Sequence, residues 1–128
     1  MDEAGATAER TFSVEEAEAL LAELRERLAR VREARQAVLA NGQPVRDSAV
    51  GNGGGARGKA YWEALASLRR EVEAMNAAGV VLRDPETGLV DFPARREGRD
   101  IFLCWRVGED HVRFWHGTDT GFSSRRPL

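Results

Sequence analysis

The chain has 128 residues, of which 42% are hydrophobic and 31% are charged, and its formal net charge is −2. A chain of this length is typical of one globular domain, so we expect a single domain over residues 1–128. The balanced charge gives no reason to expect a nucleic acid or an acidic membrane as partner, and no run of about 18 apolar residues is present to span a bilayer.

The cysteine content limits the chemistry further. Cys104 is the only cysteine, which excludes an internal disulfide and any metal site built from two cysteines of the chain. The first ten residues are acidic and lack the apolar core of a secretion signal. We therefore expect a cytoplasmic protein with a loose N-terminal segment over residues 1–11.

Residues 12–40 predict a long helix. Ser13 and Glu16 have the spacing of a capping box, in which each side chain accepts a hydrogen bond from the other residue's backbone N–H. Asn41-Gly42 is a typical helix end. The apolar side chains recur in steps of three and four, as in a coiled-coil seam, and Arg35 interrupts the series formed by Val14, Ala17, Leu21, Leu24, Leu28, Val31 and Val38.

A second helix is predicted from about Lys59 to Ala78 and ends at Gly79. Its seam has the same spacing and comprises Tyr61, Leu65, Leu68, Val72 and Met75. Two such helices joined by the glycine-rich loop 41–58 most simply form an antiparallel, coiled-coil-like helical hairpin over residues 12–78.

The glycine-rich loop contains a near match to the phosphate-binding motif G-x-x-x-x-G-K-[ST], over residues 53–60. The hydroxyl that would hold Mg²⁺ is replaced by Ala60, and no strand precedes the loop. We interpret this segment as the tip of the hairpin, with a weak anion contact near Lys59 as the open alternative.

After Gly79 the apolar period changes to two, which predicts a β-meander and a C-terminal tail over residues 79–128. The expected strands are Val80–Arg83, Leu89–Pro93, Ile101–Val107 and Val112–His116. The expected fold class is therefore α+β, a long helical hairpin followed by a small antiparallel β-meander of three to four strands.

Alternation within the last two strands predicts their register. Pairing the more apolar sets places Trp105 opposite Phe114 and Leu103 opposite His116. The other face is still apolar and carries Phe102, Cys104 and Trp115. We expect the C-terminal tail, part of the hairpin or another subunit to cover that face, and we favour a homodimer.

Several segments together resemble one known family. They are T-F-S over residues 11–13 with the E-E-A-x-x-L-L-x-x-L helix, T-G-L-V-D-F-P-A over 87–94, L-C-W-R over 103–106, F-W-H over 114–116, and the ending from Gly121-Phe122 to Leu128. On these segments the chain is similar to the prokaryotic family named domain of unknown function 2203. The resemblance covers nearly the whole chain except residues 1–10 and the glycine-rich loop, and it implies no established activity.

The candidate catalytic residues are one histidine and two carboxylates. His116 has Asp119 three residues further on and Asp91 on another strand, and a histidine paired with a carboxylate can exchange protons near neutral pH. The alternative is a histidine that fills a half-buried corner through hydrogen bonds. We favour that structural role, because no nucleophile motif such as G-x-S-x-G accompanies His116.

Asp91 lies in an otherwise apolar strand and would need an arginine or backbone donors if it is buried. A structural ion pair is the simpler interpretation. The alternative is a pocket for a small anionic ligand, formed around Asp91 and His116 by the candidate ligand-binding residues Trp105, Arg106, Trp115, Arg125 and Arg126.

Neither a metal site nor another cofactor is expected, because His111 and His116 would face opposite ways on a regular strand. Cys104 lies in mid-strand, where a small buried hydrophobic residue is the usual role. From Gly79 to the end, eight arginines balance eight acidic residues, so we expect no nucleic-acid partner.

Two functional hypotheses remain. The favoured one is a non-enzymatic interaction or scaffold protein that binds a protein partner through its hairpin and forms a homodimer. The alternative is a small anionic-ligand binder, or an uncharacterised enzyme, with a His/Asp/Arg pocket on the meander. Replacing His116 with alanine separates them, since the first predicts a loss of stability alone and the second a loss of binding.

Overall fold

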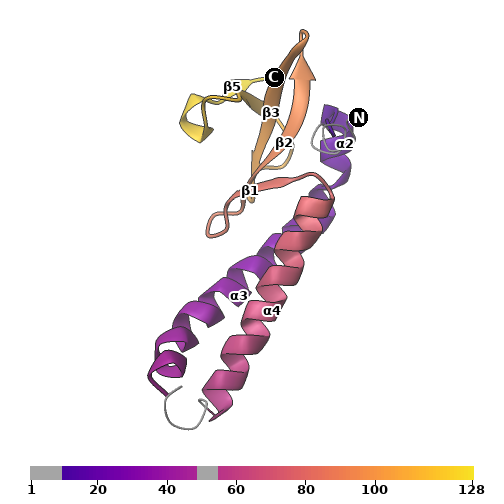
Figure 1. The fold of residues 1–128 in the computed structure, drawn as a ribbon. Helices are drawn as coiled ribbons and strands as arrows, with labels where there is room; N and C mark the ends of the chain where they lie inside the picture. Colours follow the sequence, from indigo (N-terminus) through magenta and orange to yellow (C-terminus); the bar gives the residue numbers. More distant parts are fainter. Residues whose placement is uncertain (1–9, 49–54) are drawn as a thin grey trace, which may run out of the picture.

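The computed structural model describes residues 10–48 and 55–128 and confirms the α+β class (Figure 1). Most of the expected loose segment over residues 1–11 therefore lies outside the described residues. The elements in chain order are α2 (Val14–Ala19), α3 (Leu21–Ser48), α4 (Gly55–Ala77), β1 (Val81–Asp84), β2 (Leu89–Arg96), β3 (Arg99–Arg106), β4 (Phe114–Gly117), the 3₁₀ helix η1 (Phe122–Ser124) and β5 (Arg126–Pro127).

The helical start at Ser13 is as predicted. Its hydroxyl accepts from the Glu16 backbone N–H at 3.0 Å, and the Glu16 carboxylate accepts from the Ser13 backbone N–H at 2.9 Å. The expected single helix is interrupted at Leu20, whose N–H donates to the Ala17 carbonyl three residues back. This tighter turn separates α2 from α3.

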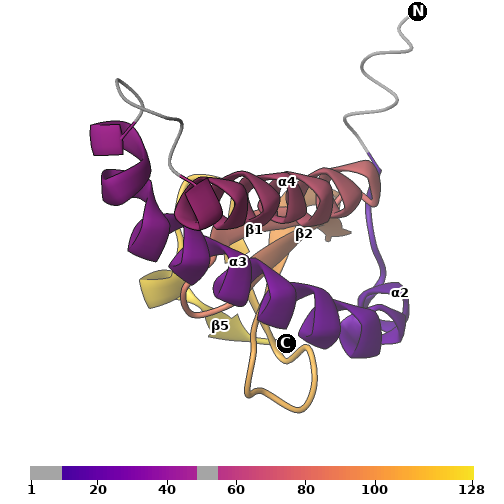
Figure 2. The same cartoon turned by 90° about the horizontal axis from the view of Figure 1, so that it is seen from below.

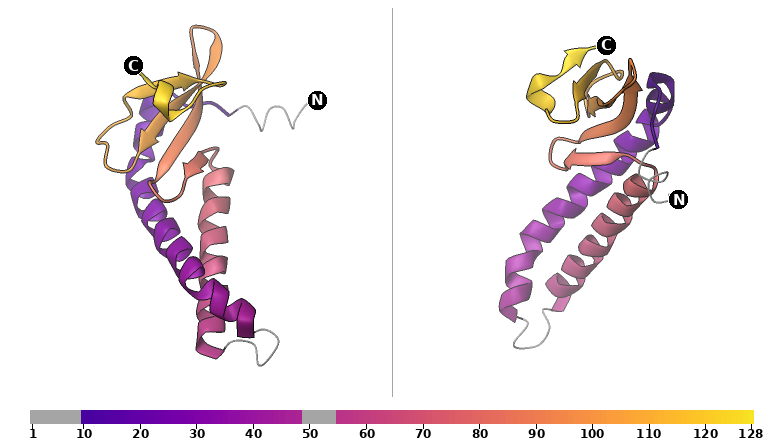
Figure 3. Two further views of the ribbon diagram at one scale, coloured as in Figure 1. Left: turned by 90° about the vertical axis from the view of Figure 1, so that its left-hand side faces the viewer. Right: turned by 45° about the horizontal axis from the view of Figure 1, so that its top comes forward.

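Helices α3 and α4 run side by side in opposite directions (Figures 1 and 3). The boundaries predicted for the connecting loop, 41–58, are wrong, because α3 continues to Ser48 and α4 already begins at Gly55. Asn41 does not cap the helix. Its side-chain amide donates to the Ala37 carbonyl at 2.8 Å along the helix, so the expected stop signal is accommodated inside α3.

The sheet has five antiparallel strands in the order β1-β2-β3-β4-β5, one more than the upper limit expected. The additional strand, β5, is only two residues long and contains Pro127, so it lacks the alternation that identifies a strand in a sequence. It forms because it pairs with β4, and the Leu128 N–H extends the contact by donating to the Arg113 carbonyl at 2.8 Å.

The core lies between the helices and one face of the sheet (Figure 2). Alternate residues of β2 and β3 point to it, which is the period of two that the sequence shows. The seam from Ala17 to Val31 was expected to join the two helices as in a coiled coil, whereas its buried residues belong to the core that includes the sheet. The most buried side chains of the core include Leu24, Leu28, Val31, Met75, Val80, Val90, Phe92, Leu103 and Trp105.

The predicted register between β3 and β4 is wrong by one residue. The structure pairs Leu103 with Trp115, and Phe102 with His116. A short hairpin loop was expected, but the connection spans residues 107–113 and is shaped by Glu109, whose carboxylate accepts from the Arg106 backbone N–H at 2.9 Å. Because side chains alternate, this shift moves His116 to the face opposite the helices.

The C-terminal tail contributes to covering that opposite face, which was one of the three coverings expected. The Arg125 guanidinium lies 4.1 Å from the ring centroids of both Phe114 and Phe122, and the Arg106 guanidinium lies 4.7 Å from that of Phe122. Along the described parts of the chain, no helix combines the length and hydropathy that a membrane crossing requires.

Candidate functional site

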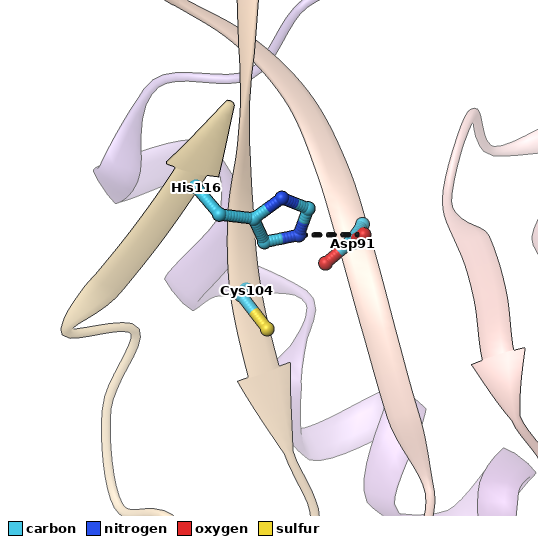
Figure 4. Close-up of side chains that lie close together, drawn as sticks. All are labelled: Asp91, Cys104 and His116. Atoms are coloured by element: carbon cyan, nitrogen blue, oxygen red, sulfur yellow. Dashed lines mark hydrogen bonds and ion pairs between the residues drawn. The ribbon is translucent and has the colours of Figure 1, made fainter. Parts of the chain in front are cut away.

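Three neighbouring strands bring Asp91, Cys104 and His116 together on the face of the sheet opposite the helices (Figure 4). Asp91 of β2 lies directly across from Cys104 of β3, and His116 follows on β4. Their side-chain oxygen, sulfur and nitrogen atoms all lie within 4.8 Å of one another. The three residues are only 2%, 1% and 2% exposed, so the cluster is held inside the protein.

Both ring nitrogens of His116 face oxygen atoms. Nδ1 lies 2.7 Å from the Gly117 carbonyl oxygen, and Nε2 lies 3.0 Å from Oδ2 of Asp91. A carbonyl oxygen only accepts hydrogen bonds, so this contact requires the proton on Nδ1. In a neutral ring, Nε2 then presents its lone pair to the carboxylate, and such a pair of acceptors needs a proton or a metal ion between them.

Asp91 is only partly satisfied by its neighbours. Its Oδ2 accepts from Nε of Arg83 at 2.8 Å and also faces His116. Its Oδ1 is buried and has no hydrogen-bond partner among the residues that the structure describes. A buried carboxylate oxygen without a partner costs about 1–3 kcal/mol or more, so Oδ1 has a strong physical demand for a donor or a cation.

The Cys104 thiol is protected from ionisation. Burial raises its pKa to about 12, and the neighbouring Asp91 carboxylate adds to the shift. The thiol is therefore protonated at neutral pH and is a poor nucleophile, which fits the small buried role expected for it.

The cluster lines a cleft of about 450 Å³. Arg83 and Leu89 contribute to one part of its wall, and the segment from Thr118 to Phe122 contributes to another. Asp119 therefore shares this cleft with Asp91 and His116, as the candidate catalytic set required.

A protein-family model with the description "Uncharacterized conserved protein (DUF2203)" matches residues 10–128. The chain belongs to the DUF2203 family. The match confirms the resemblance seen in the sequence and covers every residue that the structure describes. No curated protein and no solved structure matches the chain, so the function of this DUF2203 protein has to be inferred from its geometry.

The predicted ligand-binding residues of the DUF2203 protein do not form one pocket. Trp105 lies fully buried on the helical side of the sheet, where its indole N–H donates to the Glu109 carbonyl at 3.0 Å. Arg125 pairs with the Glu109 carboxylate at 2.8 Å. Arg106 lies over Phe122, so these arginines anchor the C-terminal tail.

Trp115 and Arg126 lie elsewhere. They pair with each other across β4 and β5 and line a separate cavity of about 740 Å³ together with Arg96 and Arg99. Trp115 and His116 are consecutive residues of β4, so their side chains point to opposite faces of the sheet.

Sequence reasoning missed Arg83 and Cys104 as members of the site. The ion-pair partner of Asp91 is Arg83, and not one of the candidate arginines Arg106, Arg125 and Arg126. The signal for both was alternation, since Arg83, Asp91 and Cys104 share a face once β1, β2 and β3 are paired.

The near match to the phosphate-binding motif lies at the tip of the hairpin. Residues 53 and 54 of this motif lie outside the described residues. Nζ of Lys59 lies 3.9 Å from Oε2 of Glu63 within α4.

Proposed function

We propose that this DUF2203 protein binds a divalent transition-metal ion, with Zn²⁺ as the best fit, through Oδ1 of Asp91, Sγ of Cys104 and Nε2 of His116. The observation that carries the proposal is that a carboxylate oxygen of Asp91, Sγ of Cys104 and a ring nitrogen of His116 lie within 4.8 Å of one another at a buried position in the cleft. Oxygen, thiolate and imidazole nitrogen are all ligands that Zn²⁺ accepts.

The ligand atoms need little adjustment to bind one ion. Zn²⁺ lies about 2.0–2.3 Å from its ligands, which places the ligands of a tetrahedral site about 3.5 Å apart. Nε2 of His116 lies 3.0 Å from Oδ2 of Asp91, the other oxygen of the carboxylate whose Oδ1 is the proposed ligand, and the ligand atoms that the three residues offer lie within 4.8 Å of one another. A side-chain movement of about 1 Å therefore suffices to form the site.

Each ligand also has the outer contacts that metal ligands usually have. The Gly117 carbonyl accepts the Nδ1 proton of His116 and so directs the Nε2 lone pair into the cluster. Arg83 binds Oδ2 of Asp91 and leaves Oδ1 for the ion. The same contacts leave neither nitrogen of His116 available to a substrate, which favours metal binding over acid–base chemistry by the histidine.

The charges of the ligands suit a divalent ion. Asp91 and the Cys104 thiolate together neutralise two positive charges, because a bound metal ion displaces the thiol proton. Three protein ligands leave a fourth position for water or a small ligand, as in zinc sites that act on substrates. The sequence-based expectation that no metal binds relied on pairing His111 with His116, whereas the proposed site uses one histidine.

Metal titration tests the proposal. Protein freed of metal by a chelator is titrated with Zn²⁺ by calorimetry, and with Co²⁺ by absorbance, where a thiolate-to-cobalt charge-transfer band reports bonding to sulfur. We expect one ion per chain and a higher melting temperature when it binds. The Cys104→Ser variant is expected to lose the band, and Asp91→Asn to weaken Zn²⁺ binding by at least about 10-fold.

His111→Gln is the matched control, because it removes the other histidine, which lies on the surface and contacts Glu18. It is expected to bind Zn²⁺ as the wild type does. Unchanged titrations with Cys104→Ser and Asp91→Asn, or a loss of binding with His111→Gln, would place the metal elsewhere. A cytoplasmic location, as expected from the sequence, would keep Cys104 reduced and able to bind.

A second candidate function, favoured by one observation, is self-association through the hairpin. Trp62 on α4 is 59% exposed, which is unusual for a large aromatic side chain. Its neighbours along the predicted coiled-coil seam, Tyr61 and Leu65, are only partly buried. A homodimer that joins two hairpins along this seam would cover these residues and supply the scaffold role, and the mass of the protein in solution tests it.

A further inference from the structure

The cavity around Trp115 is separate from the metal cluster and has a different chemistry. It lies next to the β2–β3 turn, on the face of the sheet to which Trp115 points. Its volume is about 740 Å³, and three arginines from three strands, Arg96 of β2, Arg99 of β3 and Arg126 of β5, contribute to its wall. Three guanidinium groups therefore line one cavity, beside three carboxylates, Glu97, Asp100 and Asp119.

Two of these arginines are held in place by the tryptophan. The guanidinium carbon lies 4.9 Å from the Trp115 ring centroid for Arg96 and 5.7 Å for Arg126. A guanidinium over an aromatic ring uses its flat face for this contact and keeps the N–H donors at its edge available. Because the side chains are already ordered, less rotamer entropy is lost when an anion binds.

The positive charge in the cavity is not neutralised by ion pairs. Within the described ranges, Arg96, Arg99 and Arg126 have no carboxylate within salt-bridge distance, whereas Arg95 of the same hairpin pairs with Asp100 at 2.7 Å. Glu97, Asp100 and Asp119 also line the cavity, so three arginines face three carboxylates. Asp100 is paired with Arg95, which lies outside the lining, and the unpaired groups are therefore three arginines and two carboxylates. This excess of one unpaired arginine favours an anion.

We propose that the arginine cavity binds the phosphate group of a small ligand through Arg96, Arg99 and Arg126. Guanidinium groups bind the oxygens of phosphate through paired N–H donors, and Thr118 adds a hydroxyl to the same wall. A nucleic acid is not the occupant that fits, because two arginines already lie over Trp115, where a base would have to stack. The ligand is inorganic phosphate or a phosphomonoester.

This inference goes beyond metal binding and does not depend on it. The two sites are linked in space by Thr118 and Asp119, which line both the arginine cavity and the metal cleft. The experiment is therefore performed on protein kept in a chelator, so that phosphate bound to a metal ion makes no contribution.

The test is a titration with inorganic phosphate, and in a parallel arm with glycerol phosphate, followed by calorimetry and by the NMR signal of the Trp115 indole N–H. We expect saturable binding that shifts this signal. Arg126→Gln and Arg99→Gln are each expected to weaken phosphate binding by about 10-fold, the loss of roughly one charge-assisted contact. Tighter binding of glycerol phosphate than of inorganic phosphate would identify a phosphomonoester as the ligand, and the reverse would identify the free ion.

Arg70→Gln is the matched control, since it removes one exposed arginine of α4 and leaves the cavity unchanged. It is expected to bind phosphate like the wild type. An equal loss in Arg70→Gln and Arg126→Gln would show a diffuse charge effect and overturn the proposal. So would saturation with phosphate that leaves the Trp115 signal unmoved.

Discussion

At the scale of single residues, Asp91 determines what the outer face of the sheet can do. The residues that flank it, Val90 and Phe92, are fully buried in the core, while Asp91 points the other way. Arg83 donates to Oδ2, which also faces Nε2 of His116, but Oδ1 stays without a partner among the described residues. A carboxylate that is buried and half satisfied is costly, which is why we assign it a ligand.

Gly88 is a second residue with a specific role, and it gives a prediction of stability. Its backbone φ is +73°, and a Cβ atom added there would lie 2.5 Å from Cγ2 of Val107. We expect Gly88→Ala to lower the free energy of unfolding by about 2–4 kcal/mol, because left-handed strain and overpacking add. Urea unfolding followed by circular dichroism measures this change.

Gly98→Ala separates the two causes. Gly98 has a similar φ of +79°, but nothing lies within 4 Å of an added Cβ atom. This control is expected to lose only the strain contribution, about 1 kcal/mol. Equal losses in the two variants would show that contact with Val107 has no part in the requirement for glycine at position 88.

At the scale of elements, one carboxylate joins α3 to α4. Glu71 of α4 accepts hydrogen bonds from Arg27 and Arg30 of α3, each at 2.8 Å. The Arg30 hydrogen bond, together with the charges of both arginines, lowers the pKa of Glu71 below its ordinary value of 4.5, although burial opposes the shift. The pair of helices is thus held by ionic contacts as well as by its apolar seam.

The lowered pKa of Glu71 predicts how stability depends on pH. The folded protein binds the proton more weakly than the unfolded chain, so the stabilising contribution is complete above about pH 4.5 and is lost as the pH falls through the lowered pKa. We expect Glu71→Gln to lower the free energy of unfolding by about 1 kcal/mol at pH 7, a modest effect because solvent screens the partly exposed arginines. The loss is expected to be smaller at pH 3, where the Glu71 carboxylate of the wild type is closer to protonation. The measurement is urea unfolding at the two pH values.

Glu73→Gln is the control on the same helix, at an exposed position. It is expected to leave the free energy of unfolding nearly unchanged at both pH values. If Glu71→Gln proved as harmless as Glu73→Gln at pH 7, the two ion pairs would contribute nothing to the packing of the helices.

At the scale of the whole molecule, the hairpin extends well beyond the sheet (Figures 1 and 3). The apolar seam of α3 is buried as far as Val31, whereas most of the described residues beyond it are half-buried or exposed. Helix α4 likewise has partly exposed apolar residues along its first half, and Trp62 is its exposed large hydrophobic side chain among the described residues. A surface of this kind is typical of a protein that associates.

The proposed self-association through this surface gives a prediction for the mass in solution. We expect the wild-type protein to sediment as a dimer at micromolar concentration and Trp62→Arg to sediment as a monomer, because a charge would be buried in the interface. Val107→Arg is the control, since it alters another exposed apolar residue, near Gly88 and away from α4. A wild-type monomer at high concentration, or equal dissociation by both variants, would contradict association through the hairpin.

Much of the fold is predictable because its signals are local. The capping box at Ser13, the apolar seam from Ala17 to Val31 and the alternation along β2 and β3 each depend on residues close together in the chain. The turn at Glu97-Gly98 is local as well, since a positive φ at both residues, +53° and +79°, joins β2 to β3 as a tight hairpin.

The candidate site is less predictable, because it depends on strand pairing. His116 and Asp91 were identified from their residue types, yet Asp91 meets Cys104 through the pairing of β2 with β3, and His116 joins them only when β4 takes the observed register. Trp115 and Arg126 were identified too, but the same register assigns them to another cavity with Arg96 and Arg99. A shift of one residue reverses the face of every side chain on a strand, so a small error in pairing reassigns a whole site.

The amino-acid pattern is thus sufficient for the α+β class, the family and the chemistry of the side chains available. It does not specify which of those side chains meet. Strand register is set by contacts between distant segments, such as the Glu18 carboxylate that accepts from the Val112 backbone N–H ahead of β4. Such contacts exist only in the folded chain, and for this physical reason the cluster of Asp91, Cys104 and His116 emerges from the three-dimensional structure.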